Sequence, residues 1–216
     1  MNPAGHDSEF YPVLNRYFKA RLSEFDHIPL DRGKLLDSIS TYVAQRVRKD
    51  QLARLTFICT HNSRRSQMAQ IWAQTAADYF AVPGVSVFSG GTEATAFNPR
   101  TLAALIRAGF WIDRGVLEEN PVYTVYAGNG LASVRAFSKT YLDPSNPQDG
   151  FCAVLTCSSA DRDCPVIPSA DQRVLVPYED PKSADGTDRE TEVYDERCRE
   201  ICREMAWMFA MVSEAD

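Results

Sequence analysis

The sequence predicts an α/β fold built on a parallel sheet, because short apolar strands alternate with amphipathic helices along most of its 216 residues. The first strand, 55–58, runs through a polar loop into a helix with apolar residues at three- and four-residue spacing. A second strand, 85–88, precedes a helix that opens at Asn98 and Pro99, a good capping residue followed by proline. The apolar run 151–156 is typical of a strand buried on both faces.

Residues 1–53 precede this alternation and predict a helical extension. Apolar residues recur at helical spacing in two runs, 11–22 and 36–47. We therefore expect two units, the N-terminal extension and an α/β domain that spans 54–216. The extension is open to three interpretations: it shapes substrate access, buries a dimer face, or thickens the core.

The alternation breaks between about 116 and 150, where we expect an insertion. Two strand-like runs, 122–126 and 131–137, flank the turn residues Ala-Gly-Asn-Gly and predict a β-hairpin. The chain then returns to the α/β pattern and closes with a long amphipathic helix. Thr187 and Glu190 are spaced as a capping box for that helix.

Composition places the protein among ordinary globular chains and narrows its partners. The chain is 44% hydrophobic and 24% charged, and its net charge of −6 argues against a nucleic-acid partner. Its longest apolar run, 205–212, is far shorter than the roughly 20 residues that cross a membrane, and no secretion signal precedes it. We expect a cytoplasmic protein without a membrane partner, whose six cysteines are thiols, metal ligands or redox groups.

The polar loop after the first strand carries residues suited to chemistry on an oxyanion. Cys59 and Arg65 enclose five residues between a strand and a helix, where free backbone N–H groups and the helix dipole hold anions. The same field favours a nucleophilic thiolate at Cys59, and the planar guanidinium of Arg65 grips two oxygens at once. We predict that the loop residues lining this anion site are Thr60, His61, Asn62, Ser63, Arg64 and Ser66, of which Ser66 donates a hydrogen bond to the sulfur.

Residues 59–69, Cys-Thr-His-Asn-Ser-Arg-Arg-Ser-Gln-Met-Ala, resemble the phosphate-binding loop of the low-molecular-weight protein tyrosine phosphatase superfamily. The segments 91–94, 98–99 and 179–181 fit the same resemblance. It implies a four-stranded parallel sheet flanked by helices. His61 departs from the pattern, because it stands where these loops usually carry glycine.

The resemblance also implies roles for individual residues. Cys59 is implied as the nucleophile, Arg65 as the anion clamp, Asn62 as the residue that shapes the loop, and Asp180 as the general acid on a mobile loop. The reaction also requires such an acid independently of the resemblance, because a departing alkoxide or phenolate leaves more easily once it is protonated.

Two further cysteines distinguish classes within this superfamily. Cys157 follows the buried strand and should lie at the same sheet edge as Cys59, because the carboxyl ends of parallel strands share an edge. Cys164 follows after a polar segment that predicts a short helix able to unwind. The pair resembles the redox pair of thioredoxin-coupled arsenate reductases. The resemblance implies that Cys59 attacks arsenate, Cys157 attacks the adduct and releases arsenite, and Cys164 takes over the disulfide for thioredoxin or a similar thiol reductant.

Two alternatives stay open. A phosphatase acting on phosphotyrosine or a small phosphomonoester would use a Cys59 phosphocysteine, although the segment 180–183 lacks the tyrosine pair common in tyrosine-specific relatives. A non-catalytic oxyanion-binding or redox-sensing protein would use the loop without the acid. We expect no cofactor and no metal, because Cys198 and Cys202 pack at helical spacing and nothing resembles paired Cys-x2-Cys ligands.

Overall fold

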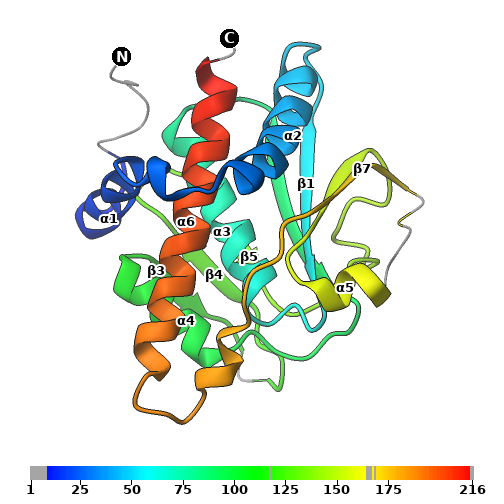
Figure 1. Ribbon diagram of the computed structural model, residues 1–216. Coiled ribbons are helices and arrows are strands. Elements are labelled where there is room, and N and C mark those ends of the chain that lie inside the picture. Colours follow the sequence, from blue (N-terminus) through cyan, green and yellow to red (C-terminus); the bar gives the residue numbers. More distant parts are fainter. Residues whose placement is uncertain (1–8, 117, 164–166, 168, 215–216) are drawn as a thin grey trace.

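The computed structural model describes residues 9–116, 118–163, 167 and 169–214, with side chains not described at 161–163. Its centre is a four-stranded parallel sheet in the order β2-β1-β6-β7 (Figure 1). The strands are β1 (Ala53–Cys59), β2 (Val85–Gly91), β6 (Phe151–Leu155) and β7 (Ala170–Leu175). The predicted parallel α/β fold is thereby confirmed. Cys59, the last residue of β1, pairs with Gly91, the last residue of β2.

Helices cover the two faces of this sheet unequally. One face packs against α2 (Leu30–Val47) and α3 (Arg65–Tyr79), and α6 (Glu190–Glu214) packs on both of these helices. The other face meets the short α5 (Ser158–Asp163), which lies on the opposite side of β1 in Figure 1. Two hydrophobic clusters result, a large one under α2, α3 and α6 and a small one under α5.

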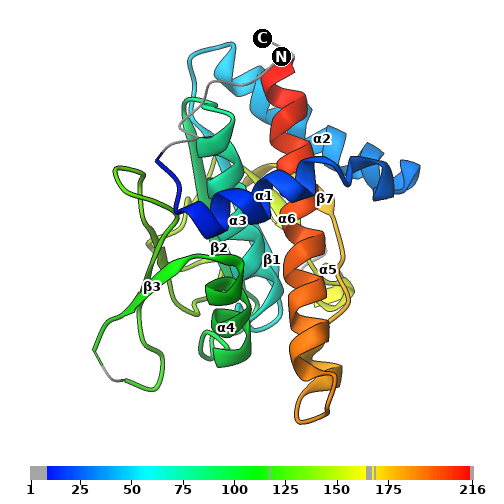
Figure 2. The ribbon, with the colours of Figure 1, turned by 90° about the vertical axis from the view of Figure 1, so that its left-hand side faces the viewer.

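The N-terminal extension belongs to the main core. Its first helix, α1 (Pro12–Leu22), lies across α6 and α3 in Figure 2, and the Phe18 ring stacks on the Trp72 ring with 6.4 Å between centroids. Leu14 and Phe18 of α1 are fully buried. Of the three roles open for the extension, the structure therefore shows core packing. A 3-10 turn, η1 (Phe25–His27), joins α1 to α2.

The insertion contains the predicted hairpin, and a strand that precedes the insertion extends it to a three-stranded sheet. β4 (Tyr123–Tyr126) pairs antiparallel with β5 (Val134–Ala136), and β3 (Trp111–Arg114) adds to β4 on its other edge. The exposed, short β3 carries no alternating apolar signal, so the sequence did not predict it. The two predicted strands are also shorter than expected, and residue 128 of the predicted turn pairs with Phe10.

Two helix starts show how local hydrogen bonds set element boundaries. α4 (Pro99–Ala108) begins as predicted, with the Asn98 side chain accepting from the N–H groups of Arg100 and Thr101. The predicted capping box of α6 is wrong in detail. The N–H of Thr187 is already bonded to the Ala184 carbonyl after the turn η2 (Pro181–Ala184), and the Glu190 carboxylate accepts instead from residue 186.

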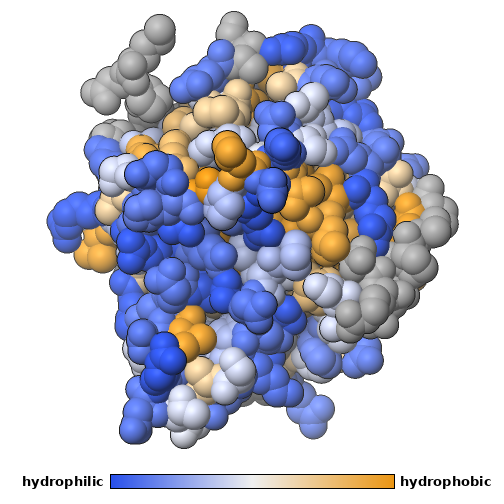
Figure 3. Space-filling model, in the orientation of Figure 1, coloured by the Kyte–Doolittle hydropathy of each residue, from blue (hydrophilic) through white to orange (hydrophobic). Residues whose placement is uncertain are grey.

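Among the residues that the structure describes, no helix has the length and apolar character to cross a membrane. Figure 3 shows a largely hydrophilic face interrupted by smaller hydrophobic patches. Isolated exposed apolar side chains such as Leu30, which is 86% exposed, are ordinary on globular surfaces.

The packing of the extension predicts a matched pair of stability effects. Leu14→Ala should lower the free energy of unfolding by about 3 kcal/mol, because it leaves a cavity at a fully buried position. Leu30→Ala removes the same atoms from an exposed position and should change it by less than about 0.5 kcal/mol. Urea unfolding monitored by circular dichroism measures both. Equal stability of the Leu14→Ala variant and the parent would contradict the core role of α1.

Candidate oxyanion site

The loop between β1 and α3 lies at the carboxyl edge of the sheet. Cys59 ends β1 and Arg65 is the first residue of α3, so the five residues between them sit at a helix N-terminus (Figure 1). The first N–H groups of a helix have no partner within it and attract anions. The strand–loop–helix arrangement predicted from the sequence is present.

The Cys59 sulfur lies within hydrogen-bond distance of the Ser66 hydroxyl. The two atoms, Sγ and Oγ, are 3.1 Å apart, and both residues are buried. The Asn62 amide donates to the same Ser66 Oγ at 2.8 Å. Because that bond uses Ser66 as an acceptor, its own hydrogen is free to point at the sulfur, which stabilises a thiolate.

Asn62 determines the shape of the loop. Its φ of 45° lies in the left-handed region, which asparagine adopts more readily than most residues. Its fully buried side chain accepts hydrogen bonds from the Lys139 N–H at 3.0 Å and from the Gln67 amide at 3.1 Å. The left-handed residue of the loop is Asn62 and not His61, so the backbone at His61 does not need the conformational freedom of glycine.

The end of β2 touches the loop backbone directly. A Cβ at Gly91 would lie 2.5 Å from the Thr60 carbonyl oxygen and 2.8 Å from the Asn62 nitrogen, which no side chain permits. The next residues bond to the loop, with the Thr92 N–H on the Cys59 carbonyl and the Glu93 N–H on the Thr60 carbonyl. The segment 91–94, singled out from the sequence, therefore forms one wall of the loop.

Arg65 and Asp180 meet across the mouth of the site. Arg65 Nη2 donates to Asp180 Oδ2 at 2.7 Å, and Nη1 donates to the Tyr178 carbonyl at 3.1 Å. Arg65 Nε is buried and has no hydrogen-bond partner in the described part of the chain. Arg65 is thus held in place by the loop that carries Asp180 and keeps a donor free for an oxyanion.

The other predicted loop residues take different positions. Ser63 is buried and donates to the Ala96 carbonyl, whereas the His61 side chain is 44% exposed, 3.7 Å from Glu93. The Arg64 guanidinium is bound by side chains from other segments: Nε donates to the Tyr194 hydroxyl at 2.9 Å and lies 4.0 Å from Asp180, and Nη2 pairs with Asp185 at 3.5 Å.

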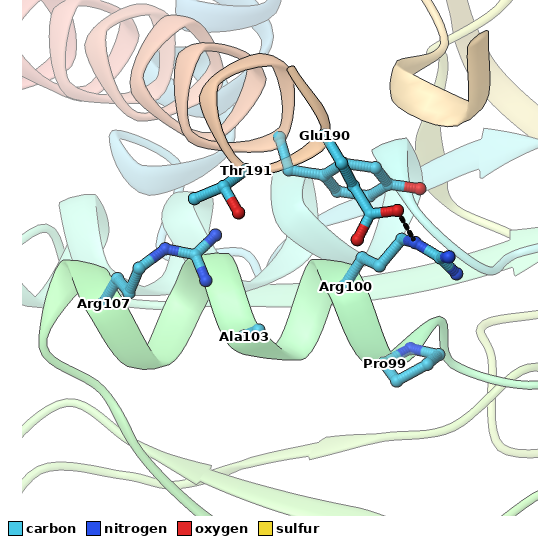
Figure 4. Close-up of a pocket in the computed structure, with 7 residues that line it drawn as sticks. Pro99, Arg100, Ala103, Arg107, Glu190 and Thr191 are labelled. Carbon is cyan, nitrogen blue, oxygen red and sulfur yellow. Dashed lines mark ion pairs between the residues drawn. The ribbon is translucent and has the colours of Figure 1, made fainter. Parts of the chain in front are cut away.

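Beyond Arg64, Tyr194 lines a pocket of about 250 Å³ between α4 and the start of α6 (Figure 4). Arg100 in this pocket is paired with Glu190 at 2.7 Å, and Arg107 is paired with Asp195 at 2.6 Å. Both guanidinium groups already have carboxylate partners, so the pocket is charge-compensated.

Cys157 lies beside the loop, as its position after β6 predicts. Its buried Sγ is 3.6 Å from Thr60 Oγ1 and accepts the Ala160 N–H at 3.3 Å. Cys59 and Cys157 belong to the same small hydrophobic cluster under α5. Cys164, the third predicted redox cysteine, lies outside the described residues. The predicted helix between the two cysteines is present as α5.

The remaining cysteines are core residues. Burial raises the pKa of Cys152 and of Cys198 to about 12, and it raises the pKa of Cys202 as well. All three pack in the large cluster, away from Cys157. The described residues hold no group of three or more side chains that suit a metal ion.

A buried trio supports the loop that carries Asp180, and sequence reasoning missed it. Arg32 of α2 donates to Glu204 at 2.8 Å and to the Pro177 carbonyl at 3.0 Å, and it lies over the Tyr178 ring. Tyr178 donates its hydroxyl to Glu204 at 2.6 Å, and burial raises the pKa of this hydroxyl well above its ordinary value. These residues are far apart in the sequence and share no local motif.

Comparison with known proteins places this site in context. No family model matches the chain. It is 30% identical over 126 residues to arsenate reductase 2 of Staphylococcus haemolyticus, a match over 58% of the chain and 76% of the relative. It is 28% identical over 159 residues to the arsenate reductase of Bacillus licheniformis, over 73% of the chain and 95% of the relative.

Solved structures agree on the fold. The low-molecular-weight protein tyrosine phosphatase of T. tengcongensis superposes with a TM-score of 0.52 at 17% identity. The superposition covers 73% of this chain and 98% of that one. The likeness therefore extends over essentially the whole of the smaller protein.

The contact at Gly91 predicts a selective loss of anion binding. Gly91→Ala should weaken phosphate binding by about tenfold or more, because the loop backbone must move and its N–H groups no longer converge. Gly33→Ala is the matched control in α2, where the added Cβ meets nothing within 4 Å. That control should raise stability by up to about 1 kcal/mol and leave binding unchanged. Calorimetric titration with phosphate measures both, and parental affinity in Gly91→Ala would refute this account of the loop.

Proposed function

Because the chain belongs to the family of arsenate reductases and low-molecular-weight protein tyrosine phosphatases, we propose that it reduces arsenate to arsenite through cysteine chemistry. The observation that carries the proposal is the position of Cys157. Its sulfur is 3.6 Å from Thr60 Oγ1, within the loop that Cys59 opens. A phosphatase needs one thiol at this edge, whereas thiol-based reduction needs a second.

In the first step, the Cys59 thiolate attacks arsenic and one arsenate oxygen leaves as water. Asp180 is placed to protonate that oxygen, and Arg65 and the loop N–H groups balance the negative charge. The product is a Cys59–arsenic adduct in which arsenic is still As(V). Ser66 is within hydrogen-bond distance of the sulfur and makes it a better nucleophile by favouring the thiolate.

In the second step, the Cys157 thiolate attacks the Cys59 sulfur. A Cys59–Cys157 disulfide forms, the S–As bond breaks, and its electron pair passes to arsenic, which leaves as arsenite, As(III). Cys164 then attacks Cys157 and frees the Cys59 thiolate. In this proposal thioredoxin or a similar dithiol reduces the resulting Cys157–Cys164 disulfide, so the reaction requires a reducing compartment such as the cytoplasm.

Replacement of the two relay cysteines tests the proposal. Cys157→Ser and Cys164→Ser should each lower steady-state arsenate reduction with thioredoxin, thioredoxin reductase and NADPH by about a hundredfold or more, because the disulfide cannot be passed on. Cys59 should stay reactive to alkylation in both variants. Cys152→Ala, a buried cysteine of the large cluster, is the control and should turn over like the parent. Parental turnover in both serine variants would overturn the relay.

A second candidate activity, phosphomonoester hydrolysis, is supported by the position of Asp180 next to Arg65 and the loop. The carboxyl is one-third exposed and lies beside the anion clamp, the position that a general acid needs for a departing alkoxide or phenolate. In this activity Cys59 forms a phosphocysteine, and Cys157 and Cys164 take no part.

The two activities can be distinguished by their different dependence on Asp180 and Cys157. Asp180→Asn should lower kcat for p-nitrophenyl phosphate by about 10²- to 10⁴-fold, the usual contribution of a general acid. Cys157→Ser should leave this hydrolysis unchanged. Hydrolysis that is insensitive to Asp180→Asn would exclude this residue as the acid. Tight oxyanion binding without turnover of arsenate or phosphate esters would favour the non-catalytic alternative.

A further inference from the structure

A second polar pocket lies on the far side of the loop wall from Cys59. Its volume is about 320 Å³, and none of its lining residues belongs to the loop 59–65. It is bounded by α3, by β2, and by the segments on either side of β5. The polar residues that line it are Gln70, Gln74, Ser133, Arg135, Lys139, Ser145 and Asn146.

Lys139 is an unusual lining residue. It is only 5% exposed, and in the described part of the chain its ammonium group makes no hydrogen bond or ion pair. The ammonium lies over the Phe137 ring, with Nζ 4.4 Å from the ring centroid. Burial lowers the pKa of Lys139 to about 8. The Asp143 carboxylate acts on this ammonium only from beyond ion-pair distance, so the fold buries a cation without an anionic partner in contact, which is costly.

Two side-chain oxygens in the same pocket also lack partners. Gln70 Oε1 and Asn146 Oδ1 are buried and accept no hydrogen bond from the described residues. Their orientation is fixed, because the Gln70 amide nitrogen donates to the Val87 carbonyl and that of Asn146 donates to the Ser89 carbonyl. The pocket therefore offers buried acceptors as well as a buried cation.

A ligand that satisfies these groups needs an anionic end and hydrogen-bond donors. An anion would pair with the ammonium of Lys139 and with the guanidinium of Arg135, which is exposed and also lines the pocket. Hydroxyl groups would donate to the two amide oxygens. We propose that this pocket binds a small hydroxylated anion, a carboxylate or a phosphate ester, through Lys139, Arg135, Gln70 and Asn146.

The pocket is linked to the oxyanion loop through the backbone of Lys139. Its N–H donates to Asn62 Oδ1 at 3.0 Å, and its carbonyl accepts the Gly91 N–H at 2.8 Å. Asn62 and Gly91 are the two residues that shape the loop. The residue that carries the buried ammonium is therefore bonded through its backbone to both residues that shape the loop.

Calorimetric titration of the Cys59→Ser protein with D-glycerate and with glycerol 3-phosphate tests the proposal and distinguishes the two anion types. Cys59→Ser prevents hydrolysis of the ester. At least one probe should bind the pocket with a Kd below about 1 mM. Lys139→Met should weaken that binding by about tenfold or more, since it removes a charge-assisted hydrogen bond. Lys139→Arg should retain it, and Lys34→Met, at an exposed lysine of α2, should not change it.

The number of binding sites that the titration measures distinguishes binding in the pocket from binding in the loop. Glycerol 3-phosphate has the loop as a second site, so Lys139→Met should weaken one of its two sites and the single site for glycerate. The proposal is overturned if neither probe binds, or if Lys139→Met binds both like the parent. Arg135→Gln, at an exposed position, should weaken binding about threefold and provides a test independent of any effect of Lys139→Met on folding.

Discussion

The structure of the site depends on one buried side chain, Asn62. Its amide nitrogen donates to Ser66, which lies beside the Cys59 sulfur, and its oxygen accepts from Gln67 of the next helix and from the backbone of Lys139. A fully buried amide with these partners satisfied is rigid, because each lost bond leaves a polar group without solvent. The backbone at this residue is left-handed, which bends the loop between Cys59 and Arg65.

The insertion and the N-terminal extension support this loop from two sides. Residues 137–141, which leave the antiparallel sheet, bond to the loop and to the end of β2. Arg32 of the extension holds the backbone at Pro177 and thereby the neighbouring segment that carries Asp180. The added segments therefore do more than enlarge the protein, since one bonds to the loop after β1 and the other bonds to the backbone near Asp180.

Local features were predictable from the sequence and distant ones were not. The positions of Cys59 and Arg65 follow from a strand, a loop and a helix that are contiguous, and Cys157 follows from the rule that parallel strands share a carboxyl edge. The Asn62–Lys139 bond joins residues 77 apart and Arg32–Glu204 joins residues 172 apart, so no periodicity reveals them. Arg64 was assigned by charge alone, and its contact with Tyr194 depends on how α6 packs.

The most direct measurement of the central claim is the rate at which iodoacetamide alkylates each cysteine at pH 7, followed by peptide mass mapping with and without phosphate. A sulfur at the base of an anion-binding loop should make Cys59 the fastest site to react, well ahead of core residues such as Cys152, and saturating phosphate should slow it about tenfold or more. A Cys59 that reacts no faster than Cys152, or at a rate that phosphate leaves unchanged, would contradict the account.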